Sequence, residues 1–186
     1  MSGNLQDVDW TQIPAPSDDG AAAHLTGMTL PSIPLTATAG GTVDLSAIEG
    51  LTVVYIYPMT STPGVALPDN WDMIPGARGC TPQSCAFRDH YAQLRDLGVD
   101  HLYGLSTQST QDQAEAATRL HLPFPLLSDA DLAFGTALNL PTFSADGKTL
   151  LKRLTLILQG GVIHDTIYPV FPADQNAEIV ITRLRG

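Results

Sequence analysis

The 186-residue sequence has few cysteines, few basic residues and no long apolar run. Two cysteines are too few for the disulfide scaffold of a small secreted protein. Lysine and arginine number 9 against 19 acidic residues, a formal net charge of −10, which disfavours nucleic acid and anionic membrane surfaces as partners. The acidic N-terminus lacks the basic start and apolar core of a secretory signal, and no later stretch is long enough to span a bilayer. These absences predict a soluble, cytoplasmic protein.

What is present is enough for one folded domain. Hydrophobic residues make up 44% of the chain, which provides a core for a domain of this length. Residues 1–25 mix proline, serine, aspartate and alanine without periodicity, so they predict a flexible or loosely docked N-terminal arm. Residues 26–186 form the predicted domain.

Alternating strand and helix patterns predict an α/β fold with a mixed central sheet between helices. Residues 28–48 contain short alternating segments around Gly40 and Gly41, which is typical of a hairpin. Residues 51–58 are a continuous β-rich apolar run, which indicates a strand buried on both faces. Further strands are predicted at 100–107 and on both sides of Gly160-Gly161 within 152–168, and further helices at 110–121, 128–139 (opened by a Ser128 cap) and 172–186.

The two cysteines lie together in the segment GCTPQSC. Thr81 followed by Pro82 predicts an N-cap and a first helical residue, with the helix continuing to about residue 97 before a glycine. Cys80 is therefore expected at a helix N-terminus, where the helix dipole and a nearby cation such as Arg78 favour a reactive thiolate. Cys85 falls in the second turn, where we expect a more buried thiol.

The spacing of Cys80 and Cys85 limits how they can react with each other. Five residues along an ideal helix separate Cα atoms by roughly 8–9 Å, beyond the ~7 Å limit for a disulfide. A disulfide between a sulfenic acid at Cys80 and the thiol of Cys85 therefore requires local unwinding. The spacing predicts a catalytic cycle with a local unfolding step and no permanent bridge.

Other interpretations of the cysteines remain open on the spacing alone. Two unreactive buried thiols are common in small proteins. A zinc site needs about four ligands, and only His90 lies close in sequence, so we expect neither a metal nor another cofactor. A reductase of the thioredoxin type is disfavoured because its thiols have the spacing C-x-x-C.

The order of motifs over Met28–Tyr168 resembles the peroxiredoxins, in particular the bacterioferritin-comigratory or Q type. The resemblance is carried by VVYIYPMTSTPG, GCTPQSCAFRDH, GLSTQS, FPLLSDADLAFGTALNL and KRLTLILQGGVI. It implies a thioredoxin-like fold and thiol-dependent reduction of hydrogen peroxide or organic hydroperoxides. It also implies that Cys80 is the peroxidatic cysteine, that Cys85 is the resolving cysteine and that Arg153 contacts peroxide and thiolate. The implied reductant is thioredoxin- or glutaredoxin-like, acting on a monomer or homodimer.

The sequence departs from the family pattern before Cys80. Pro58 and Thr62 match the first half of the family's active-site motif, which implies a catalytic hydroxyl at Thr62. An insertion at 65–79, VALPDNWDMIPGARG, then separates Thr62 from the cysteine. We expect the insertion to loop out and leave Thr62 in place. The alternative is that it rebuilds the pocket wall, with Arg78 or Trp71 contributing to substrate selection.

Two other functions fit the same residues. A thioredoxin-fold enzyme would exchange thiols and disulfides without reducing peroxide. A non-catalytic redox sensor or binding module would use the cysteines as a switch and the insertion as a partner surface.

Overall fold

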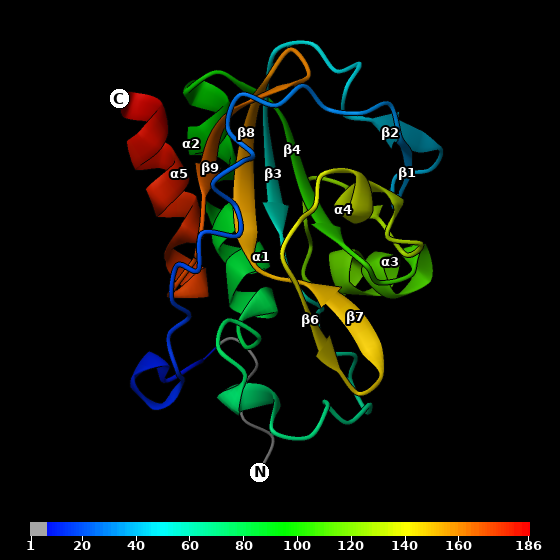
Figure 1. The fold of residues 1–186 in the computed structure, drawn as a ribbon, viewed down its shortest axis with the longest axis vertical. Helices are drawn as coiled ribbons and strands as arrows, with labels where there is room; N and C mark the ends of the chain where they lie inside the picture. The colour runs from blue at the N-terminus through cyan, green and yellow to red at the C-terminus, as the bar shows by residue number, and fades with distance from the viewer. Residues whose placement is uncertain (1–6) are drawn as a thin grey trace.

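The computed structural model describes residues 7–186, so the first six residues of the predicted arm lie outside the described part of the chain. Its centre is a seven-stranded mixed sheet of strand order β2-β1-β5-β4-β3-β8-β9 (Figure 1). The strands of this sheet are β1 (Pro34–Ala37), β2 (Thr42–Asp44), β3 (Leu51–Ile56), β4 (Val99–Ser106), β5 (Leu126–Ser128), β8 (Leu154–Gln159) and β9 (Val162–Ile167). Strands β3, β4 and β5 are parallel, and β8 runs antiparallel to β3. The predicted α/β fold with a mixed sheet is confirmed.

Helices cover both faces of the sheet. Alternate residues of β3 point to opposite sides, and both sides are buried: Val53 and Tyr55 belong to one hydrophobic cluster, Val54 and Ile56 to the other. The first cluster is covered by the helices that lie together at the left of Figure 1, namely α1 (Cys80–Asp89), α2 (Tyr91–Asp96) and α5 (Asn176–Arg185). The second is covered by α4 (Ala133–Ala137) and by residues 22–30. Helix α3 (Thr110–Arg119) connects β4 to β5.

Several predicted elements are confirmed with small shifts in their bounds. The hairpin around Gly40-Gly41 is β1–β2, and the hairpin around Gly160-Gly161 is β8–β9. The helix predicted over 81–97 is broken at His90 into α1 and α2. The prediction of Thr81 as its N-cap is wrong: the cap is Gly79, since the chain enters the helix through a left-handed conformation with φ 109°.

The helix predicted from Ser128 begins later than expected. Ser128 is the last residue of strand β5, which pairs with β4, and α4 begins only at Ala133. The buried carboxylate of Asp129 accepts hydrogen bonds from the backbone N–H groups of Phe134 and Gly135 at 2.9 and 2.8 Å. Asp129 therefore stabilises the start of α4, as expected from a carboxylate near a helix N-terminus.

Other elements were not predicted from the sequence. Strands β6 (Thr142–Ala145) and β7 (Lys148–Leu151) form a separate antiparallel hairpin, and the inserted segment contains a short 3-10 helix, η2 (Trp71–Met73). Figure 1 shows this hairpin beside the inserted segment at the lower end of the sheet. The two pack together through a hydrophobic cluster of their own.

The described part of the N-terminal arm contacts the domain. The indole Nε1 of Trp10 donates a 2.9 Å hydrogen bond to Asp174, and its ring packs edge-on against Phe171. Asp19 accepts hydrogen bonds from Lys152 and Tyr168. The flexibility of this arm stays a prediction. Within residues 7–186, no helix has the length and apolar character needed to cross a membrane.

Candidate active site

Cys80 is the first residue of α1, directly after the left-handed Gly79. Its side chain is only 4% exposed. The backbone N–H groups of the first helical turn have no carbonyl partner within the helix, and Pro82 has none to offer. The N–H groups of Cys80 and Thr81 are therefore the free donors at the positive end of the helix dipole beside the sulfur.

Gly79 is required by conformation and by space. A methyl group at this position would lie 2.5 Å from Cη2 of Trp10 and 2.9 Å from Cβ of Ala173. The φ of 109° is itself unfavourable for any residue with a side chain. The arm and the short helix η3 (Ala173–Gln175) thus hold the cap of α1 between them.

We expect Gly79→Ala to lower the free energy of unfolding by about 1–3 kcal/mol. Gly98→Ala is the matched control, because Gly98 also has a positive φ, 93°, but open space where the methyl group would go. Urea denaturation of both variants measures the difference. Equal losses would contradict the tight packing of Trp10 and Ala173 against the cap.

Arg153 lies beside the sulfur of Cys80. It stands just before β8, 73 residues further along the chain, and is 3% exposed. Its Nη2 lies 3.2 Å from Cys80 Sγ. The same nitrogen is 3.1–3.2 Å from three backbone carbonyl oxygens at the end of the insertion, those of Gly76, Ala77 and Arg78. The guanidinium thus places a fixed positive charge at the sulfur and holds the chain that leads into α1.

Sequence analysis missed the residues that orient Arg153. Gln83 accepts a hydrogen bond from Arg153 Nη1 and donates one of 2.8 Å to Oδ1 of Asn176. Thr155 donates a 2.7 Å hydrogen bond to the same oxygen. Gln83, Asn176 and Thr155 are all fully buried. The signal for Gln83 was available, because a residue three positions after Cys80 shares its face of the helix.

Cys85 lies in the second turn of α1 and is 8% exposed. Both cysteines are free thiols. Burial raises the pKa of the Cys85 thiol, and the positive charge of Arg88 offsets this only partly. The two cysteines therefore differ as expected in their surroundings, since only Cys80 has a guanidinium in direct contact with its sulfur.

The insertion does not loop out, contrary to expectation. A cavity of about 20 Å³ reaches Cys80, and the insertion supplies four of its lining residues: Leu67, Trp71, Arg78 and Gly79. The insertion is held there because its apolar side chains bury themselves against the β6–β7 hairpin. The alternative, that the insertion rebuilds the pocket wall, is the arrangement observed.

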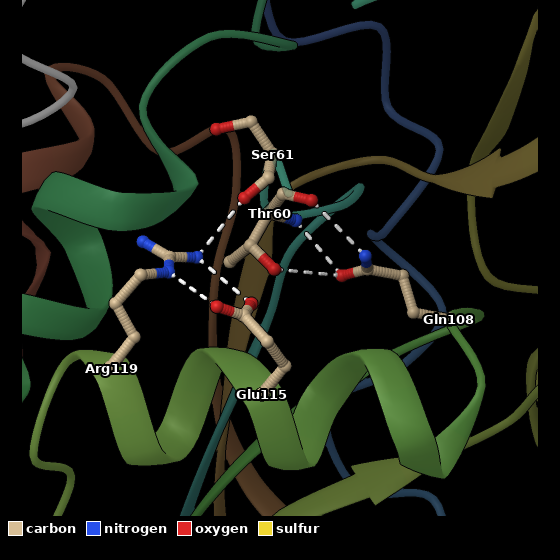
Figure 2. A network of polar contacts seen from close by, with 5 residues as sticks. All are labelled: Thr60, Ser61, Gln108, Glu115 and Arg119. Carbon is tan, nitrogen blue, oxygen red and sulfur yellow. Dashed lines mark hydrogen bonds and ion pairs between the residues drawn. The ribbon is translucent and has the colours of Figure 1, made fainter. Parts of the chain in front are cut away.

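Thr62 is not among the residues that line the Cys80 cavity. Among residues 7–186, no hydrogen bond of its side chain is found, and Ser61 lines the Cys80 cavity instead. Figure 2 shows that Thr60 and Ser61, the two residues before Thr62, are held by side chains from α3 and from the loop that precedes α3. Gln108 bonds the backbone N–H and carbonyl of Thr60 at 2.8 and 3.1 Å, and Arg119 donates a 3.0 Å hydrogen bond to the Ser61 carbonyl.

A larger cavity of about 320 Å³ lies between the arm, the insertion and the domain. Arg153, Lys152 and Tyr168 line it, but Cys80 does not. Within the described residues, no group of three or more His, Cys, Asp or Glu side chains is placed to hold a metal ion.

Comparison with known proteins decides the family. The family model described as Redoxin matches residues 25–181. A Mycobacterium tuberculosis protein named as a peroxiredoxin is 30% identical over 154 residues, which cover 82% of this chain and 80% of that one. The chain belongs to the peroxiredoxins. A peroxiredoxin named bcp from Coxiella burnetii is 29% identical to it over 163 residues, covering 85% of this peroxiredoxin and 97% of the relative.

The structural comparison agrees with the bcp/Q type. The crystal structure of peroxidoxin BcpB from Mycobacterium tuberculosis has a TM-score of 0.69 and 26% identity, with 87% of this chain and 97% of that chain covered. The peroxiredoxin spans about half the length of two chloroplastic peroxiredoxin Q relatives. The resemblance found in the sequence is confirmed, and with it the thioredoxin-like fold and the thiol peroxidase class of enzyme.

Proposed function

We propose that Cys80 reduces hydroperoxides as the peroxidatic cysteine. The thiolate attacks the terminal oxygen of the peroxide, the O–O bond breaks, and the departing oxygen takes up a proton to leave as water or an alcohol. Cys80 becomes a sulfenic acid, which is the oxidised product of this step. Negative charge moves from the sulfur to the departing oxygen during the attack, so donors must be placed at both.

The observation that carries this proposal is the 3.2 Å contact between Arg153 Nη2 and Cys80 Sγ. A buried guanidinium at this distance stabilises negative charge on the sulfur and on the departing peroxide oxygen. The free N–H groups of Cys80 and Thr81 supply further donors at the same point. The catalytic role of the Thr62 hydroxyl implied by the family pattern stays a prediction, and Thr62 is not among the residues that line the cavity.

Cys85 then resolves the sulfenic acid. Its sulfur attacks the Cys80 sulfur, a disulfide forms, and the hydroxyl of the sulfenic acid leaves as water. Because the two cysteines lie five residues apart on α1, the first turn must unwind before the sulfurs meet. Unwinding also exposes the Cys85 thiol, which removes the burial that raises its pKa and allows it to ionise.

We expect Cys85→Ser to stop the cycle after its first step. One equivalent of hydrogen peroxide should convert the variant to a sulfenic acid, which contains one more oxygen atom than the thiol and is therefore about 16 Da heavier. The wild type should instead form an internal disulfide. Intact-mass spectrometry separates the two species. Wild-type protein that accumulates the same sulfenic acid and forms no internal disulfide would exclude Cys85 as the resolving cysteine.

Stopped-flow mixing of the reduced protein with hydrogen peroxide tests the proposed function directly. Oxidation much faster than that of free cysteine supports a peroxidase. Rates no faster than free cysteine would favour the redox sensor or binding module, and reduction of insulin faster than reduction of peroxide would favour the thiol–disulfide oxidoreductase.

The reductant, the assembly and the location follow from the same proposal. A thioredoxin- or glutaredoxin-like dithiol would reduce the Cys80–Cys85 disulfide, and turnover with each purified reductant identifies which. A monomer or homodimer and a cytoplasmic location stay predictions, which sedimentation analysis and cell fractionation test.

A further inference from the structure

We infer that the insertion makes this peroxiredoxin selective for hydrogen peroxide over bulky organic hydroperoxides, with Trp71 as the residue that closes the cavity. The inference rests on the proposed role of Cys80. It concerns the class of substrate that can reach the Cys80 sulfur. The insertion at 65–79, which separates the two halves of the family's active-site motif, would set this limit.

The size of the Cys80 cavity supplies the first argument. Its volume is about 20 Å³, and a water molecule needs about 10–15 Å³ of such space. The cavity therefore holds one or two water-sized molecules. Hydrogen peroxide meets this limit, whereas a hydroperoxide with a phenyl ring and a branched carbon, such as cumene hydroperoxide, does not.

The chemistry of the wall supplies the second argument. Met59, Leu67 and Trp71 form its apolar side. Trp71 is 4% exposed although it lies on an inserted segment. A large aromatic ring that lines the same cavity as the reactive cysteine occupies space that the substrate's organic group would otherwise use.

The wall is supported from outside. Trp71 packs with Ala77, Ala145 and Leu150 in one buried cluster, and its ring centroid lies 6.1 Å from that of Phe143. The last three of these partners belong to the β6–β7 hairpin. Moving Trp71 away from the cavity would expose this cluster to water, which opposes opening.

Both ends of the inserted segment are tied to the domain. Arg119 donates to the Ser61 carbonyl before it, at 3.0 Å, as Figure 2 shows. Arg153 bonds the carbonyls at its end. Within it, Arg78 pairs with Asp72 at 2.9 Å. These bonds and the packing against the β6–β7 hairpin hold the inserted segment at the cavity, so the limit on substrate size applies in the resting enzyme.

The experiment compares the oxidation of reduced Cys80 by hydrogen peroxide, tert-butyl hydroperoxide and cumene hydroperoxide. Rate constants for this first step are measured by rapid mixing and quenching, without any reductant. For the wild type we expect rates to fall with increasing size, with cumene hydroperoxide slower by about 10- to 100-fold or more. Trp71→Ala should raise the rate with cumene hydroperoxide by roughly tenfold or more while changing the hydrogen peroxide rate much less.

Matched variants separate cavity size from loosened packing. Ile74→Ala alters the same cluster, but Ile74 does not line the Cys80 cavity, so the ratio of the rates should stay at the wild-type value. Trp71→Phe should shift the ratio by an intermediate amount. Leu67→Ala enlarges the cavity at a half-buried position and replaces Trp71→Ala if that variant does not fold.

The outcomes distinguish this inference from the function on which it rests. Slow oxidation of the wild type by every peroxide would overturn the peroxidase proposal itself. Fast oxidation by hydrogen peroxide and cumene hydroperoxide alike would overturn the size limit and leave the peroxidase intact. A ratio that changes equally in Ile74→Ala and Trp71→Ala would show that loosening of the cluster, and not the Trp71 side chain, sets the selectivity.

Discussion

Replacement of Cys80 by serine should abolish peroxide reduction, with a loss in kcat/KM on the order of 10⁴-fold or more. Serine preserves the size of the side chain and the position at the start of α1, so Arg153 and the helix dipole keep their places. The hydroxyl group stays protonated near neutral pH and is a far weaker nucleophile than a thiolate. The loss therefore reports the sulfur atom itself.

Cys85→Ser is the matched control for this variant. It makes the same chemical change five residues along the same helix, at a site without the Arg153 contact, and should leave the first oxidation step fast. Both variants are assayed by single-turnover consumption of peroxide. Consumption retained in Cys80→Ser and lost in Cys85→Ser would reverse the two assigned roles, and consumption retained in both would show that Cys80 is not required for peroxide reduction.

Patterns that depend on local sequence were sufficient for much of the fold. The run at 51–58 is buried on both faces because β3 lies between two strands and under helices on both sides, and its unbroken hydrophobicity indicates this directly. The Gly160-Gly161 pair marks the turn between β8 and β9 for the same local reason. The cysteine segment likewise contains local signals of a helix start, so the position of Cys80 at a helix N-terminus was predictable.

Elements that depend on distant partners were not predictable in this way. Ser128 has the character of a helix cap, but pairing with β4 places it in a strand. Trp71 lies in a segment without regular periodicity. It is buried because the β6–β7 hairpin, which begins at Thr142, provides an apolar surface for it. The expectation that the insertion loops out failed for this reason.

In the active site, too, features set by the local sequence were predictable and features set by distant partners were not. The residue type and spacing of the cysteines indicated redox chemistry, but nothing local distinguishes Arg153 from an ordinary strand arginine. Its role was expected only from the family resemblance. The hydrogen bond between Gln83 and Asn176, which joins positions 93 residues apart, could be found only from the folded structure.

Arg153→Met should lower the rate of Cys80 oxidation by hydrogen peroxide by about 10²- to 10³-fold. Methionine keeps an apolar stem of similar length but removes the charge and every donor. Arg153→Lys should recover part of the loss, since it restores the charge without the planar fork that reaches Gln83, the carbonyls and the sulfur together. Arg183→Gln, which removes a surface arginine paired with Asp165, is the control and should leave the rate unchanged.

A purely structural role for Arg153 makes a different prediction, because the residue also holds the carbonyls that lead into α1. Alkylation of Cys80 by iodoacetamide separates the two roles, since that reaction needs an accessible sulfur anion but has no departing oxygen to stabilise. If Arg153 acts on the oxygen as well as the sulfur, Arg153→Met slows peroxide reduction much more than alkylation. Equal slowing of both reactions would confine Arg153 to the sulfur, and faster alkylation with unchanged peroxide reduction would reduce its role to closing the chain over Cys80.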